Sequence, residues 1–261
     1  MISFLLALLA CTGAFDSPFP SASSAARGGP DAALDASGDA VEGNPALAAG
    51  GGWSAGTDWT RPLGLGGLDQ TGVWVRTPGP GLSGTAWRWR ALVAGEVYRE
   101  DQLACDVAAG WNGIRLGGGV RWGRVEVAGR NLGEPVGWAG GLAWEPVAGW
   151  AVGASWEDPS GLRSSGMPLP WNLRAGGGWR SADSSWISEV GAWRDQLSPW
   201  SWNLGQEWRI EPIRVRLGVR TDPLVLCMGL GATWRAIRID WGAEVESRFG
   251  WQHHLGLSWR M

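Results

Sequence analysis

The sequence predicts an all-β fold, an antiparallel transmembrane β-barrel. Apolar and polar residues alternate over stretches of ten or more residues, as in strands with one apolar and one polar face. These stretches match the roughly 9–11 residues that a tilted strand needs to cross a bilayer. The 261 residues also include 43 Gly and 22 Trp. This composition disfavours helices, because Gly costs about 1 kcal/mol at each helical position.

The composition also excludes several other classes of protein. Gly has no three-residue period, so the chain is not collagen. The isoelectric point near 5.5 argues against a basic nucleic-acid binder. The abundant Trp needs burial or lipid, which argues against disorder over most of the chain.

The N-terminus carries the one strongly apolar run, residues 1–11. This run is shorter than the roughly 20 residues of a membrane-spanning helix and fits the core of a secretory signal peptide. We expect a signal peptide over residues 1–14. The residues before and at Cys11 (Leu-Leu-Ala-Cys) also resemble a lipoprotein box, which would make Cys11 a lipidated first residue. The alternative is an unmodified Cys11 beside an ordinary cleavage site.

The composition shifts near residue 50. Residues 1–50 hold one Arg against five acidic residues, whereas residues 51–261 hold 21 Arg and 20 acidic residues. Residues 15–50 are also poor in Trp and rich in Ala, Ser, Gly, Asp and Pro. This shift predicts a separate N-terminal segment over 15–50 and a barrel domain over 51–261.

Alternation and turn residues predict the strands in chain order. Candidate strands cover 52–60, 70–77, 84–94, 98–111, 114–122, 124–131, 136–145, 149–157, 170–180, 184–194, 200–210, 213–221, 224–235, 237–247 and 251–261. A closed single-chain bacterial barrel needs an even number of strands, so one of these fifteen is expected to be wrong. The doubtful ones lie within 52–77 or at the short 124–131. We expect fourteen strands, with twelve as the alternative.

Trp residues recur near both ends of the same strand face. The pairs are Trp138/Trp144, Trp150/Trp156, Trp171/Trp179, Trp202/Trp208 and Trp251/Trp259. Their spacing spans roughly 15–20 Å along the membrane normal, which approaches the apolar band between two aromatic girdles. A soluble sandwich or propeller with a Trp-rich core is the alternative, but it would not require Trp at both ends of one face.

The polar strand face is expected to line the lumen. In the last four strands it gathers a charge cluster of Arg214, Arg216, Arg220, Arg238, Asp240, Glu244 and Glu246.

Residues suited to catalysis or metal binding are few. His253 and His254 are adjacent and therefore point to opposite faces of a strand, so they cannot bind one metal together. Ser258 lies about 13 Å along the strand from His254, too far for a nucleophile and its base. We expect no enzyme activity, no cofactor, no metal and no nucleic-acid partner.

The chain end resembles the outer-membrane barrel assembly signal. His254, Gly256, Trp259 and Met261 occupy its polar, glycine, aromatic and terminal hydrophobic positions, with Met in place of the usual Phe. This resemblance implies a bacterial outer-membrane location, with the barrel assembly machinery and outer-membrane lipid as partners.

A second resemblance concerns residues 34–47, which include Asn44, Pro45 and Ala46. They resemble the N-terminal hatch segment of the FadL-like transporters of hydrophobic compounds and their PorV-type relatives. Residues 129–135 and 216–223 look like strand–turn segments of the PorV-type branch. The resemblance implies a fourteen-stranded barrel with residues 15–50 as a hatch in its lumen. The acidic residues of 31–42 would then dock on the lumen arginines, unless those pair across strands with Glu207 and the acids of the cluster.

Two functions remain open at this point. The first is that of a PorV-type structural barrel associated with secretion or surface assembly, favoured because most connections are short and only 158–170 is long. The alternative is a hatch-gated transporter of small hydrophobic compounds such as fatty acids. The implied partners are secretion-system proteins in the first case and a hydrophobic small molecule in the second.

Overall fold

A computed structural model describes residues 20–29, 32–34, 43–62, 67–162, 171–196, 198–247 and 250–261. The expected signal peptide, Cys11 and the acidic residues at 16, 31, 35, 39 and 42 lie outside the described residues.

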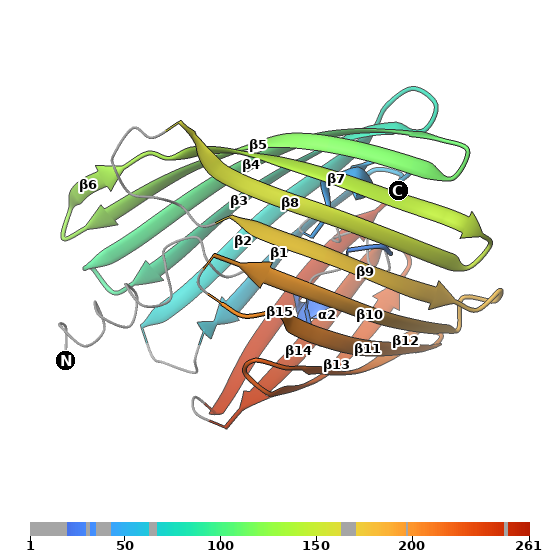
Figure 1. The fold of residues 1–261 in the computed structure, drawn as a ribbon. Coiled ribbons are helices and arrows are strands. Elements are labelled where there is room, and N and C mark those ends of the chain that lie inside the picture. The colour runs from blue at the N-terminus through green and yellow to red at the C-terminus, as the bar shows by residue number, and fades with distance from the viewer. Residues whose placement is uncertain are drawn as a thin grey trace.

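The described chain forms one antiparallel sheet that closes into a barrel (Figure 1). Its strands are β1 (Ser54–Arg61), β2 (Leu68–Pro78), β3 (Ser83–Ala94), β4 (Tyr98–Trp111), β5 (Ile114–Val127), β6 (Arg130–Gly133), β7 (Val136–Val147), β8 (Trp150–Leu162), β9 (Asn172–Arg180), β10 (Trp186–Asp195), β11 (Ser201–Ile210), β12 (Ile213–Arg220), β13 (Val225–Trp234), β14 (Ile237–Glu246) and β15 (Gly250–Arg260).

Fourteen of these strands form the ring. Each pairs with its neighbour in the chain, β5 pairs with β7, and β15 returns to pair with β1, with Ser54 opposite Arg260. The prediction of fourteen strands is confirmed, and the alternative of twelve is wrong.

The remaining strand, β6, is a short addition to the end of β5. The candidate strand 124–131 is therefore wrong as a separate crossing. Side-chain alternation continues unbroken past Gly123, so residues 124–127 belong to β5. The chain turns only at Ala128 and Gly129, both of which have positive φ.

The two ends of the barrel differ. At the end where β15 finishes, which we call the terminal rim, the connections between strands have two to five residues. The opposite rim has several longer connections and carries β6 (Figure 1). The connection between β8 and β9 is shorter than expected, because β8 extends to Leu162 and includes part of the predicted loop 158–170.

The outer surface of the barrel is apolar. On β13, Leu230 and Trp234 are 51 % and 68 % exposed, whereas the inward-facing Val225 is 1 % exposed. Exposed Leu, Val, Ile and Trp side chains recur on the outward positions of almost every strand of the ring. An apolar surface of this extent is suited to lipid rather than to water.

The predicted pairs of Trp contribute to this surface. Eight of those ten residues are among the exposed large hydrophobic side chains, and Trp179 and Trp208 are half-buried. Their role as two girdles remains a prediction. No helix within the described residues has the length and apolar character to cross a membrane.

We expect Leu230→Arg to destabilise the barrel in a lipid bilayer by about 2–4 kcal/mol, because Leu230 lies at the middle of an outward-facing strand face. Trp234→Arg, at the strand end, should cost about 0–1 kcal/mol. Denaturant titration in vesicles measures both. Equal costs for the two variants would contradict a membrane around this face.

Candidate functional site

The lumen holds part of the N-terminal region, residues 20–29, 32–34 and 43–50, which we call the inner segment. Its α2 helix (Ala22–Ala25) contacts β13, β14, β15 and β1, and its 3-10 helix η2 (Pro45–Ala48) contacts β2 to β5 and β7. Both helices are completely buried, and α2 is visible inside the wall in Figure 1. The inner segment therefore spans the lumen from one side of the wall to the other.

Side-chain caps shape both helices locally. Ser21 caps α2 by accepting the N–H of Ser24. Asn44 caps η2: its carbonyl oxygen accepts the N–H of Ala46 at 2.9 Å, and Pro45 occupies the first helical position. The amide nitrogen of Asn44 also donates to the carbonyl oxygen of Leu142 on β7, at 2.9 Å. The predicted motif Asn44, Pro45, Ala46 thus lies buried in the lumen and ties the inner segment to the wall.

Inward-facing glycines make room for the inner segment. A Cβ atom added at Gly117 would lie 2.5 Å from the backbone nitrogen of Ala46, and one at Gly242 would lie 2.5 Å from the carbonyl oxygen of Ala22. Real Cβ atoms do not approach other atoms this closely, so the wall must lack side chains there. The same close approach to the inner segment occurs at Gly84, Gly141, Gly153, Gly178, Gly205, Gly218 and Gly229.

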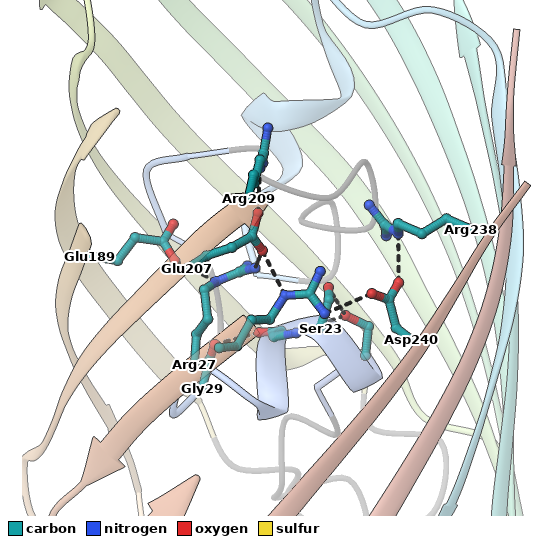
Figure 2. A network of polar contacts seen from close by, with 11 residues as sticks. Ser23, Arg27, Gly29, Glu189, Glu207, Arg209, Arg238 and Asp240 are labelled. Carbon is teal, nitrogen blue, oxygen red and sulfur yellow. Dashed lines mark hydrogen bonds and ion pairs between the residues drawn. The ribbon is translucent and has the colours of Figure 1, made fainter. Parts of the chain in front are cut away.

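One charged side chain anchors the α2 half. Arg27, which is 1 % exposed, donates from Nε to Glu189 at 2.7 Å and from Nη1 to Glu207 at 3.2 Å (Figure 2). Glu207 also accepts from two arginines of the wall, Arg209 at 2.5 Å and Arg216 at 2.6 Å. A buried carboxylate shared by three guanidinium groups is well compensated for the loss of water.

The network continues across the wall beyond Glu207. Arg216 reaches over β13 to Asp240 on β14, at 2.7 Å, and Asp240 also accepts from Arg238 at 2.6 Å (Figure 2). The crossing passes Gly231, where a Cβ atom would lie 2.5 Å from an oxygen of Asp240. Glycine at this position therefore opens the path of the ion pair.

A second network lies on the η2 side of the lumen. Arg121 donates to Asp106 at 2.6 Å and to Glu157 at 3.2 Å. Beside it, Ser155 and Arg174 donate to the carbonyl oxygen of Gly43, at 2.6 Å and 3.3 Å. The inner segment is thus held by the charged side chain of Arg27 in one half, and in the other by the side chain of Asn44 and the backbone carbonyl of Gly43.

Part of the predicted charge cluster forms ion pairs within the wall, at Asp240 and at Glu244. Arg216 and Arg238 share Asp240, and Arg220 pairs with Glu244 at 3.4 Å. Arg214 faces the lumen but makes no ion pair with a described residue, and Glu246 ends β14 at the opposite rim. The structure therefore shows cross-strand pairing for Arg216 and Arg220, whereas Arg238 pairs with Asp240 within β14. Docking of the acidic residues of 31–42 on these arginines stays a prediction, because those acidic residues lie outside the described residues.

The sequence reasoning missed the residue that anchors the segment. The expectation concerned the acidic residues of 31–42 on wall arginines, and these acidic residues lie outside the described residues. The contact that the structure shows has the opposite polarity, with Arg27 on wall carboxylates. A signal was available, because Arg27 is the only basic residue in the first fifty.

The residues of the predicted assembly signal lie on β15. His254 is buried and accepts or donates a hydrogen bond with Thr60 at 2.9 Å, and Gly256 faces the lumen beside Asp58. Trp259 faces outward, and the backbone N–H of Met261 donates to Trp53 at 3.0 Å. Adjacent His253 points outward, as the alternation predicts. Among the described residues, no group of three or more His, Cys, Asp or Glu side chains is placed to hold a metal ion.

No family model and no curated protein matches the sequence. Solved structures do match. A TodX deltaS2S3 mutant, described as a monoaromatic hydrocarbon channel, has a TM-score of 0.63 at 12 % identity, covering 92 % of this chain and 97 % of that one. The outer membrane protein Omp33 of Acinetobacter baumannii has a TM-score of 0.54 at 5 % identity, covering 81 % of this chain and 98 % of that one. These identities establish the fold alone: the chain has the fold of outer-membrane β-barrels.

The glycine positions predict a sharp contrast between neighbours. Gly117→Val should displace η2 and cost about 1–3 kcal/mol of stability, because its side chain would overlap the backbone at Ala46. Gly118→Val is the matched control. Gly118 faces outward, and a Cβ atom added there would lie 3.6 Å from its nearest neighbour, the carbonyl oxygen of Ala139. Hydrogen exchange of residues 43–50 should rise only in the Gly117 variant. Equal exchange in both variants would contradict the close seating.

Proposed function

We propose that the protein is a structural barrel of the bacterial outer membrane, kept closed by its own hatch and associated with secretion or surface assembly. The observation that carries this proposal is the close contact between the inner segment and the inward-facing glycines of the wall. Nine wall positions leave no space for even a Cβ atom between wall and segment. A lumen filled in this way is suited to a barrel that presents its rims to other proteins.

The anchoring contacts support the same role. Arg27 and its carboxylate partner Glu207 are almost completely buried, so the contact is shielded from water and salt. Removing one partner of such a pair is costly, because a buried charge is left uncompensated. Opening the hatch would therefore require breaking a buried ion pair, which is energetically costly.

The location follows from the outer surface and the rims. An apolar outer face, closed backbone pairing and short connections at one rim are typical of outer-membrane barrels, in which the short turns face the periplasm. We infer that the terminal rim faces the periplasm and that the opposite rim faces the cell exterior. The resemblance of the chain end to the assembly signal supports this orientation.

A hatch-gated transporter of small hydrophobic compounds is the second candidate. It is favoured by the shared fold with the TodX variant, which is described as a monoaromatic hydrocarbon channel. The charged lining of the described α2 half, with Glu189, Glu207, Arg216 and Asp240, favours it less, because an apolar solute gains nothing from such a wall.

We expect the purified protein to show little conductance in planar bilayers and no uptake of a fluorescent fatty acid into vesicles. Arg27→Glu should raise conductance, because it places a third carboxylate against Glu189 and Glu207 and expels this part of the hatch. Single-channel recording measures the change.

The control is the charge swap Arg27→Glu with Glu189→Arg, which should restore most of the closure. Fatty-acid uptake by the unaltered protein would overturn the structural role in favour of transport. High conductance of the unaltered protein would contradict closure by the hatch, on which both the structural role and the hatch-gated transporter depend.

A further inference from the structure

The charged side chains on the outside of the barrel are distributed unevenly. Among described strand residues that point outward, each charged one lies in the half of its strand nearer the opposite rim. The cationic or titratable basic members are Arg61, Arg99, Arg124, Arg194 and His253, which we call the basic belt. The outward strand ends at the terminal rim carry Trp, Ile, Thr and other uncharged residues instead.

Indole rings accompany the basic belt. The guanidinium of Arg61 lies over the ring of Trp59, with 5.3 Å to the centroid, and that of Arg194 lies over Trp171 at 5.8 Å. Trp side chains prefer the interface between hydrocarbon and headgroups, where an apolar ring and a polar edge are both satisfied. These pairs therefore place the belt at headgroup depth rather than far out in water.

The third aromatic group is a stack on β14 and β15. The ring of His253 lies near those of Trp241 and Trp251, with centroid distances of 6.1 Å and 6.3 Å. In the sheet, His253 is paired directly with Arg61 on β1. The stack and the Arg61–Trp59 pair thus form one continuous patch across three adjacent strands.

Two cations of the belt, Arg61 and Arg194, can accept further anionic partners, whereas Arg99 and Arg124 already pair with Asp101 and Glu126. Arg194 makes no ion pair with a described residue. Arg61 pairs with Asp69 at 3.3 Å, but the two side chains are 45 % and 41 % exposed. An exposed pair of this kind contributes little, so a phosphate can share or replace the carboxylate.

We propose that the basic belt binds the phosphate groups of the anionic lipid in the leaflet around the opposite rim. This inference rests on the proposed outer-membrane location and orientation. In that orientation the opposite rim lies in the outer leaflet, which consists of a phosphorylated glycolipid. Guanidinium groups bind phosphate in a bidentate manner, and juxtamembrane Arg residues are attracted to anionic lipid surfaces. The outward strand ends at the terminal rim, which carry uncharged residues, face the other leaflet.

The test compares two rims of one protein. The variant Arg61→Gln with Arg194→Gln removes both cation–indole pairs of the belt. Arg235→Gln is the matched control, since Arg235 lies over Trp234 at 5.2 Å in the turn at the terminal rim. Each folded protein, checked by heat-modifiable gel migration, is titrated in zwitterionic micelles with lipid A and with dephosphorylated lipid A, using Trp fluorescence as the readout.

We expect each belt arginine to contribute about fivefold to lipid A binding, so the double variant should bind about 25-fold more weakly. Arg235→Gln should bind like the unaltered protein, and the dephosphorylated lipid should bind weakly to all three. Unchanged binding by the double variant, equal loss in the Arg235 variant, or tight binding of the dephosphorylated lipid would each overturn the proposal. Conductance plays no part in this titration, so an open pore would contradict the closed-barrel role without affecting it.

Discussion

A strand in lipid cannot leave its backbone groups unpaired, and the rest of this structure depends on that constraint. The sheet closes where β1 meets β15, so that every strand of the ring has two neighbours. Closure fixes which side chains meet lipid and which meet the interior, because alternate residues point to opposite faces. The extra strand β6 has a single described neighbour, and it lies at the rim, beyond the ring that must be closed.

The interior solves a second problem, the filling of a fourteen-stranded barrel with the chain's own N-terminal region. Two devices are combined: glycines that bring backbone against backbone, and buried charges paired across strands and with Arg27. The devices depend on one another, since Gly231 opens the path by which Arg216 reaches Asp240. The glycine content noted at the outset is therefore largely a property of the lumen and the turns.

Sequence reasoning reached the fold because alternation is a local signal that closure leaves unchanged. It also placed Asn44 and the lumen face of β12 to β15. It could not separate residues 124–127 from a further strand, since the alternation of β5 continues beyond Gly123. The partners of Arg27 were also out of reach, because Glu189 and Glu207 are brought to it by strands distant in the sequence. Alternation predicts which face of the sheet a side chain occupies, but the wall side chains that the inner segment contacts depend on how deeply it lies in the lumen.

The sharing of Glu207 has a consequence for the order of assembly. Its carboxylate is balanced by Arg209 and Arg216, both of which belong to the wall itself. The wall can therefore complete its own charge pairing on neighbouring strands before the N-terminal region enters the lumen. Arg27 then arrives at a site that is already organised, and Glu189 is the carboxylate whose described ion pair depends on its arrival. Charge pairing in the wall is thus independent of the inner segment at Glu207 and depends on it at Glu189.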